Sequence, residues 1–225
     1  MAVSLTDSDA DASEERGARA RTRKLMLETA IELMQQGFTP SVSDVAEAAQ
    51  VSRATAYRYF PTQADLVHAV VNEALGPILS WSSDSTNAEE RVDDLLTESM
   101  PRILEFEATF KAALKLSLEH WAKQQAGESD EPQFKRGHRV ELLQQAIAPL
   151  KKTLPKRQFQ RLAMALSLTY GLEAVVVLKD LWGAEFGEVQ DVSRWAARAL
   201  VKAAVTEAAQ KRRQLEKARA KRASS

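Results

Sequence analysis

Residues 39–66, TPSVSDVAEAAQVSRATAYRYFPTQADL, read as three short helical segments separated by two tight breaks. Ser41 suits the start of the first segment, because its hydroxyl can accept from free N–H groups and Asp44 follows three residues later. Ser52 can cap the second segment, RATAYRYF, and Thr62 can cap the third, which continues as QADLVHAVVNEAL. Two short helices joined by a turn, with a helix on either side, have the layout of a helix-turn-helix unit.

The preceding helix of this unit is predicted over residues 22–37. Met26, Ala30 and Leu33 recur at helical spacing on one face, which Leu27 and Met34 widen. Gly37 suits the left-handed residue that ends a helix.

The segment RATAYRYF has the composition of a recognition helix. Ala56 and Phe60, four residues apart, can face the core. Burying all of the remaining polar and cationic side chains would cost too much free energy, and these side chains suit contacts with bases and phosphates in a major groove. The alternative for this composition alone is an ordinary surface helix with a partly buried tyrosine.

The stretch SVSDVAEAAQVSRATAYRYFPTQADL resembles the DNA-binding headpiece of TetR-family transcriptional regulators, over residues 22 to about 70. The resemblance implies an N-terminal headpiece that binds operator DNA and a larger helical domain that binds a small molecule and dimerises. It places Val45, Val51, Ala56 and Phe60 in the headpiece core. The residues expected to contact DNA in and around the two central helices are Ser41, Ser43, Arg53, Ala54, Thr55, Tyr57, Arg58, Tyr59 and Gln63.

Two positions depart from the family pattern. Gln50 stands at the turn where the family usually has glycine, so the turn is either strained or differently shaped. Gln63 stands where the family tends to have lysine, and it can still donate a hydrogen bond to a phosphate.

Charge is balanced overall, with 31 Lys and Arg against 31 Asp and Glu, but it is uneven along the chain. Residues 25–80 hold two arginines against six acids, so the body of the headpiece is not basic. A basic block over residues 16–24 precedes it, and we expect Arg21 and Arg23 to contact phosphates or the minor groove. The acidic stretch at the start of the chain and the basic stretch at its C-terminal end are most simply interpreted as solvated tails.

The fold class expected for the whole chain is all-α, with a three-helix headpiece followed by a larger helical domain. Gly76-Pro77 and a Ser-rich stretch mark the junction, and helical patterns run roughly over 88–99, 102–125, 134–152, 156–182 and 189–215, with breaks at Pro101 and Pro155. The expected organisation is an acidic disordered tail over 1–18, a helix-turn-helix domain over 19–75, a ligand-binding and dimerisation domain over 76–213 and a basic tail over 214–225.

The last two helical patterns favour a homodimer. The segment RLAMALSLTYGLEAVVVLKDLW is apolar on several sides, and DVSRWAARALVKAAV offers an alanine-rich face, so both need partners. The alternative is that they are the central helices of a monomer. The expected interface residues are Leu162, Leu166, Tyr170, Val177, Trp195, Ala199 and Ala203.

A small-molecule site needs apolar walls with a few polar groups, and the middle helices offer both. Plain core packing is the alternative for each aromatic residue. The candidates are Phe106, Phe110, Trp121, Phe134, His138, Tyr170 and Glu173.

Several function classes are excluded or disfavoured. The chain has no cysteine, and its three histidines lack ligand spacing, so we expect neither a metal site nor a cofactor. The acidic opening MAVSLTDSDADASEER is unlike a signal peptide, and a cytoplasmic protein is expected. The function favoured is a ligand-responsive repressor bound to a palindromic operator. The alternatives are a helix-turn-helix protein that senses no small molecule and a helical enzyme, for which no catalytic constellation is visible.

Overall fold

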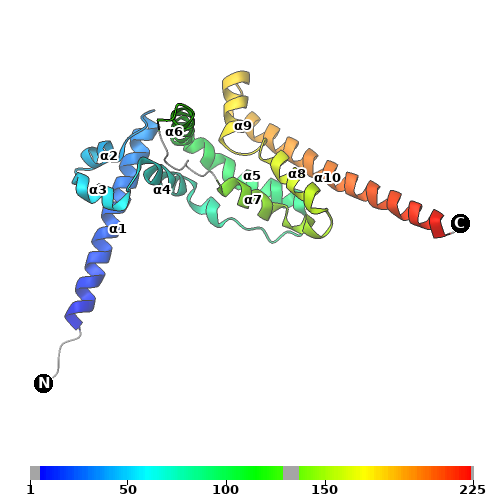
Figure 1. Ribbon diagram of the computed structural model, residues 1–225, viewed down its shortest axis with the longest axis horizontal. Coiled ribbons are helices and arrows are strands. Elements are labelled where there is room, and N and C mark those ends of the chain that lie inside the picture. Colours follow the sequence, from blue (N-terminus) through cyan, green and yellow to red (C-terminus); the bar gives the residue numbers. More distant parts are fainter. Residues whose placement is uncertain (1–5, 129–136, 224–225) are drawn as a thin grey trace. The chain divides into compact units, whose positions relative to one another are not determined.

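The computed structural model describes residues 6–128 and 137–223, and the side chains of residues 17–128 and 137–220. All regular elements in these ranges are helical, as the sequence predicts (Figure 1). The chain forms two compact units: residues 1–74 with 106–135, and residues 75–105 with 136–225. Within the described ranges no helix is both long and apolar enough to span a membrane.

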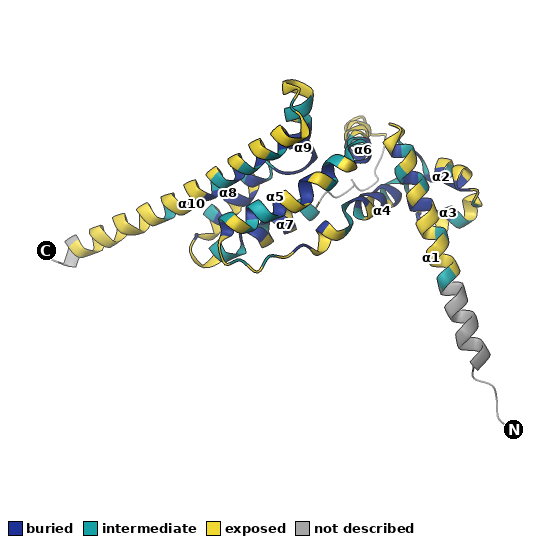
Figure 2. Ribbon diagram, turned by 180° about the vertical axis from the view of Figure 1, so that it is seen from behind, coloured by how far each residue is buried: buried dark blue, intermediate teal, exposed yellow. Residues whose placement is uncertain are grey.

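The first unit contains the predicted helix-turn-helix. Its helices are α1 (Thr6–Gln35), α2 (Val42–Ala48), α3 (Arg53–Tyr59), α4 (Gln63–Leu75) and α6 (Glu107–Gln125). Helix α1 packs against α2 and α6, and α2 packs against α3. The core includes Met26, Met34, Val45 and Phe60, all buried, as Figure 2 shows for one side of each helix.

Local capping explains where these helices begin. The α2 start is a complete capping box: the Asp44 N–H donates to Ser41 Oγ, and the Ser41 N–H donates to the Asp44 carboxylate at 2.8 Å. Ser52 caps α3 more simply, because its hydroxyl accepts a hydrogen bond from the N–H of Thr55 at 3.1 Å. The predicted cap at Thr62 is also present, since the Asp65 N–H donates to its hydroxyl at 3.1 Å.

The second unit is a layer of helices around α5 and α10. In chain order it consists of η1 (Gly76–Ser80), α5 (Ala88–Glu105), α7 (His138–Ala146), η2 (Ala148–Lys152), α8 (Lys156–Leu166), α9 (Leu172–Val176), the π-helical turn η3 (Val177–Leu181) and α10 (Phe186–Ala223). Helix α10 packs along α5 and α8, and α7 packs against both α5 and α8.

Several predicted helix boundaries differ from the structure: α1 begins at Thr6 instead of residue 22, α10 runs over residues 186–223 instead of 189–215, and two breaks are misplaced. Pro101 lies inside α5, which continues to Glu105; Pro101 is exposed, and Met100 and Ile103 are buried on the other side of the helix. The helix expected over 156–182 stops at Leu166 and resumes at Leu172. Between them Gly171 adopts φ 102° and ψ −172°, a conformation essentially restricted to glycine.

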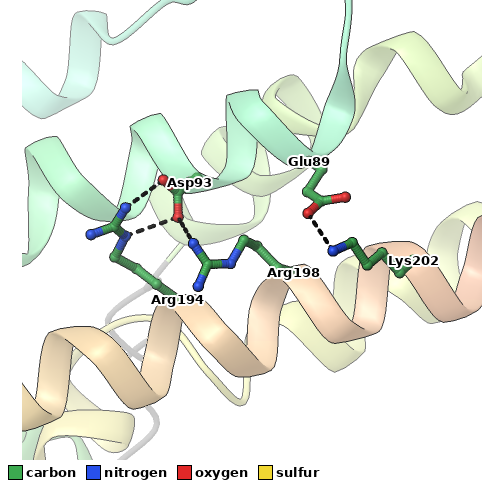
Figure 3. Close-up of polar contacts among 5 residues, drawn as sticks. All are labelled: Glu89, Asp93, Arg194, Arg198 and Lys202. Carbon is green, nitrogen blue, oxygen red and sulfur yellow. Dashed lines mark hydrogen bonds and ion pairs between the residues drawn. The ribbon is translucent and has the colours of Figure 1, made fainter.

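Ion pairs fix α10 against α5 (Figure 3). The Asp93 carboxylate accepts hydrogen bonds from Arg194 Nε at 2.8 Å and Arg194 Nη2 at 2.6 Å, with Arg198 Nη1 at 3.3 Å. One turn away Lys202 Nζ lies 3.1 Å from Glu89 Oε1. Hydrogen bonding to Arg194 lowers the pKa of Asp93, so this carboxylate is an anion bound by arginines.

Candidate nucleic-acid interface

One narrow apolar side of helix α3 packs into the core of the first unit, and most of its remaining surface is exposed to solvent. Ala56 is fully buried and Phe60, at its C-terminal cap, is 2% exposed. The outward residues are Arg53, Ala54, Tyr57 and Arg58. Tyr59 is half-buried, with its ring centroid 6.4 Å from that of Phe60. The exposed side therefore offers two guanidinium groups and a phenol within a short helix.

Hydrogen bonds order part of this surface. Tyr57 OH lies 3.2 Å from Ser43 Oγ, which links α3 to α2. Thr55 Oγ1 accepts from Ser52 Oγ at 2.9 Å and from Arg58 Nη2 at 3.4 Å. These contacts hold donor groups at both ends of α3 in defined positions, which reduces the side-chain entropy lost when they bind phosphate.

Ser41 and Gln63, also predicted to contact DNA, use their polar atoms in a helix cap and in a bond to the loop before α2. The Ser41 hydroxyl donates to Asp44 Oδ2 at 2.8 Å, and the same cap lowers the pKa of Asp44 through the hydrogen bond from the Ser41 backbone. Gln63 Nε2 donates to the carbonyl oxygen of Pro40 at 3.0 Å and to that of Thr39 at 3.4 Å. Gln63 thus joins the start of α4 to the loop before α2, a role that its position alone did not reveal.

The basic block before the headpiece lies on α1, which extends back to Thr6. Arg21 and Arg23 are both exposed. The Arg23 guanidinium carbon lies 5.8 Å from the centroid of the Phe60 ring, so this side of α1 is next to the C-terminal end of α3. The structure thus brings Arg23 to the end of the candidate recognition helix.

The turn between α2 and α3 places Gln50 in the left-handed region, the first of the two alternatives expected from the sequence. Gln50 has φ 54°, and in the described residues it is the one non-glycine with a positive φ. The Gln50 N–H donates to Glu47 O at 3.1 Å, and the Val51 N–H donates to Ala46 O at 2.8 Å. This is the Schellman pattern, in which the left-handed position usually belongs to glycine. The same pattern closes α1 at Gly37, with φ 89°.

The predicted ligand-site residues divide between the two units. In the first unit Phe110 is buried, Phe106 is half-buried and Trp121 is 55% exposed; Phe134 lies outside the described residues. In the second unit Tyr170 is buried, whereas His138 and Glu173 are half-buried.

A polar cluster around Tyr170 and Glu173 includes Arg139, which the sequence analysis missed. Arg139 Nη2 forms an ion pair with Glu173 Oε2, and Arg139 Nη1 donates to Ser167 O at 3.3 Å. A Cβ on Gly171 would lie 2.6 Å from Arg139 Nη2, so glycine leaves the space that the guanidinium occupies. Burial raises the pKa of Tyr170, and a hydrogen bond with Ser99 opposes that shift.

The predicted dimer residues also fall into two groups. Leu162, Leu166 and Tyr170 are buried in the core of the second unit, so they have no surface left for a partner. The exposed members are Val177, Trp195, Ala199 and Ala203. Larger apolar side chains that the sequence analysis did not select are exposed in the same region of the chain: Met164 on α8, Leu168 just after α8, Leu181 on η3 and Trp182 just after η3.

Comparison with known proteins agrees with the geometry of the first unit. Residues 26–70 match the family model described as bacterial regulatory proteins, tetR family. The headpiece over residues 26–70 is therefore of the TetR-family type. A stretch of 58 residues is 41% identical to the HTH-type transcriptional repressor LfrR of Mycolicibacterium smegmatis, covering 26% of this chain and 31% of that repressor.

The fold similarity extends beyond the TetR headpiece. The crystal structure of a TetR transcriptional regulator from Rhodococcus sp. RHA1 superposes with a TM-score of 0.53, over 83% of this chain and 97% of that one. At 21% identity, this match shows a shared fold.

Proposed function

We propose that the protein is a DNA-binding transcriptional repressor that acts as a homodimer on a palindromic operator and is released by a small-molecule effector. The observation that carries this proposal is the orientation of α3: Ala56 and Phe60 hold it in the first unit, while Arg53, Ala54, Tyr57 and Arg58 face outward. The family match over residues 26–70 supports it, as does the similarity to a protein named as a transcriptional repressor.

The chemistry of α3 suits a major groove. An arginine can bond a guanine edge through two parallel hydrogen bonds, and the Ala54 methyl can contact a thymine methyl. The hydroxyls of Tyr57 and Ser43, 3.2 Å apart, can donate to neighbouring phosphates. Arg23 beside Phe60 adds a cation at the end of α3 for the adjacent phosphate or minor groove.

This assignment is tested by selecting bound duplexes from a random DNA library with the purified protein. We expect two inverted half-sites, about 34–36 Å apart from centre to centre. Arg53→Ala and Tyr57→Ala should each weaken binding to the selected site by about 5-fold to 150-fold, because each good base or phosphate contact is worth about 1–3 kcal/mol. Arg157→Ala, which removes an exposed arginine of α8 in the second unit, is the matched control and should bind as wild type. Unchanged sequence-specific binding by both headpiece variants would refute the role of α3.

Dimerisation is proposed through exposed apolar side chains on α8, η3 and α10 and on the residues that directly follow α8 and η3. Leu168, Trp182 and Trp195 are 80%, 79% and 67% exposed, and large apolar side chains gathered on neighbouring elements usually mark an interface. A second copy is the occupant that a palindromic site requires, since a twofold interface presents the two reading helices symmetrically.

The oligomeric state measured by sedimentation equilibrium tests this surface. Trp195→Glu should convert the dimer to a monomer without unfolding it, because the side chain contributes little to the core of its own unit. Trp121→Glu makes the same change at a comparably exposed tryptophan of α6 and should leave the dimer intact. A wild-type chain that sediments as a monomer would contradict the proposal.

The effector site is proposed to include the cluster of Arg139, Tyr170 and Glu173 in the second unit. Here an ion pair with half-buried members lies beside a buried phenol, and such groups can orient a ligand inside apolar walls. Thermal-shift screening against lipophilic and charged compounds tests it. A stabilising compound should lose its effect in Tyr170→Phe or Glu173→Gln and should weaken DNA binding. A screen in which no compound stabilises the protein would favour the alternative of a DNA-binding protein without a small-molecule effector.

A further inference from the structure

The last helix continues beyond its contacts with the second unit. Glu207 of α10 is paired with Arg161 of α8, with 2.5 Å between its Oε2 and Arg161 Nη2. From residue 209 to residue 220 every residue is exposed, and α10 runs on to Ala223. Figures 1 and 2 show this end of α10 extending away from α5 and α8, with exposed positions on every side. We call residues 208–223 the terminal helix segment.

The terminal helix segment carries a large positive charge. Its basic residues are Lys211, Arg212, Arg213, Lys217, Arg219, Lys221 and Arg222. Against these seven stands a single acid, Glu216, so the segment has a net charge of +6. The whole chain has 31 basic and 31 acidic residues, which leaves 24 basic and 30 acidic residues elsewhere, a net charge of −6. The net charge of the rest of the protein is therefore unfavourable for binding a polyanion, whereas that of the segment is favourable.

The arrangement of these charges indicates the kind of partner. Residues 211–213 are consecutive cations, and consecutive positions on an α-helix point about 100° apart, so the charge surrounds the axis. Leu215 is the one large apolar residue between residues 208 and 223. A helix that lies in a membrane surface or an apolar groove needs an apolar face, which this segment lacks.

Helix formation in the segment is favoured by residue type and opposed by charge. The sequence AAQKRRQLEKARAKRA contains only good helix formers, without glycine, proline or β-branched residues. Arg213, Lys217 and Lys221 follow each other at intervals of four, where like charges destabilise a helix. A bound polyanion removes that repulsion, so binding and helix formation reinforce each other.

We propose that the terminal helix segment binds the phosphate backbone of double-stranded DNA without reading its sequence. This inference rests on the proposed function, in which DNA is the partner of α3. Residues 211–222 span about 18 Å of helix at about 1.5 Å per residue, a length over which duplex DNA carries about ten phosphates. Seven cations over that length approach the charge density of the duplex. The segment supplies the sequence-independent attraction that a body of net charge −6 cannot supply.

The test compares the full chain with a variant in which the seven basic residues of the segment are replaced by glutamine, which preserves helix propensity. Binding to a duplex without the selected site is measured by fluorescence anisotropy between 50 and 200 mM salt. If each segment neutralises three or four phosphates, the slope of log K against log salt should become shallower by about 3 in the variant. At the lowest salt the variant should bind at least tenfold more weakly.

Two controls isolate the contribution of charge in the terminal helix segment. Lys211→Arg, Lys217→Arg and Lys221→Arg together keep the charge and should keep the affinity and the slope. Arg53→Ala in the otherwise unchanged chain should lose affinity for the selected site while retaining binding to the other duplex. This second control separates failure of the terminal helix segment from failure of the proposed function of α3.

Two outcomes would overturn the inference. One is an unchanged salt slope and affinity in the glutamine variant, with circular dichroism showing that its helix content is retained. The other is binding of the full chain to vesicles of anionic lipid that depends on the seven cations, while binding to the duplex does not depend on them.

Discussion

Gln50 offers a sharp test of the backbone reasoning, because the same turn occurs elsewhere in the chain with glycine. The turn after α2 and the turn after α1 share the Schellman hydrogen bonds, with Gln50 at φ 54° in one and Gly37 at φ 89° in the other. An L-residue with a Cβ loses on the order of 1–2 kcal/mol in the left-handed region. Gln50→Gly removes that strain but makes the unfolded chain more flexible, which costs about 0.4–1 kcal/mol. The net expectation is a stabilisation of about 0.5–1 kcal/mol.

The assay is equilibrium unfolding in urea, followed by circular dichroism. The midpoint should rise with an unchanged m-value, and the melting temperature should rise by about 1–4 °C for a chain of this size. Gln50→Ala keeps the Cβ and removes only an exposed side chain, so it should stay within about 0.5 kcal/mol of wild type.

Gly37→Ala is the converse change. No heavy atom lies within 4 Å of the position that its Cβ would take, so its cost of about 1 kcal/mol is expected from the backbone alone. If Gly37→Ala destabilises the protein as expected while Gln50→Gly does not stabilise it, then the strain assigned to Gln50 is wrong.

Three further predictions concern the second unit and acid stability. Gly171→Ala should lower the free energy of unfolding by at least about 2 kcal/mol, because the backbone conformation of Gly171 is strained for L-residues and the new Cβ would meet the Arg139 guanidinium. Gly187→Ala has open space at its Cβ, so it should be neutral or slightly stabilising in the same unfolding experiment. Asp93→Asn should lower the free energy of unfolding in urea by about 1–2 kcal/mol, since two arginines lose their anion. Lys202→Ala should lower it by less than about 0.5 kcal/mol, because that lysine is mostly exposed. Equal losses in the two variants would contradict this ranking. The folded-state pKa of Asp93 is lowered, so its contribution is complete above the ordinary aspartate pKa of about 4 and is lost as the pH falls below it. The free energy of unfolding should therefore fall less steeply with decreasing pH in Asp93→Asn than in wild type. The same pH dependence in both proteins would contradict the stabilising role of the Asp93–Arg194 ion pair.

The sequence predicted the headpiece well because its signals are local. Ser41, Ser52 and Thr62 cap helices by bonding their own neighbours, and the spacing of Ala56 and Phe60 fixes which side of α3 is buried. These contacts lie within a few residues in the chain, so a single sequence reveals them. The left-handed Gln50 was also foreseeable, since the turn position demands that conformation whichever residue occupies it.

The second unit was less predictable because its contacts join residues far apart in the sequence. Hydrophobic periodicity marked Leu162, Leu166 and Tyr170 as apolar, but it could not say whether the same chain or a partner covers them. The ion pair of Arg139 with Glu173 depends on the break at Gly171, and a run of apolar residues concealed that break.

The central claim, that the outer face of α3 lies in the major groove of DNA, can be tested by directed cleavage. The chain has no cysteine, so Ala54→Cys introduces a single thiol on that face, to which an iron chelate can be attached. On the selected duplex we predict cuts centred on the major groove of each half-site, and none from the same reagent attached through Ala122→Cys on the exposed side of α6. Cleavage from position 122 in the absence of cleavage from position 54, with DNA binding intact in both variants, would contradict the account.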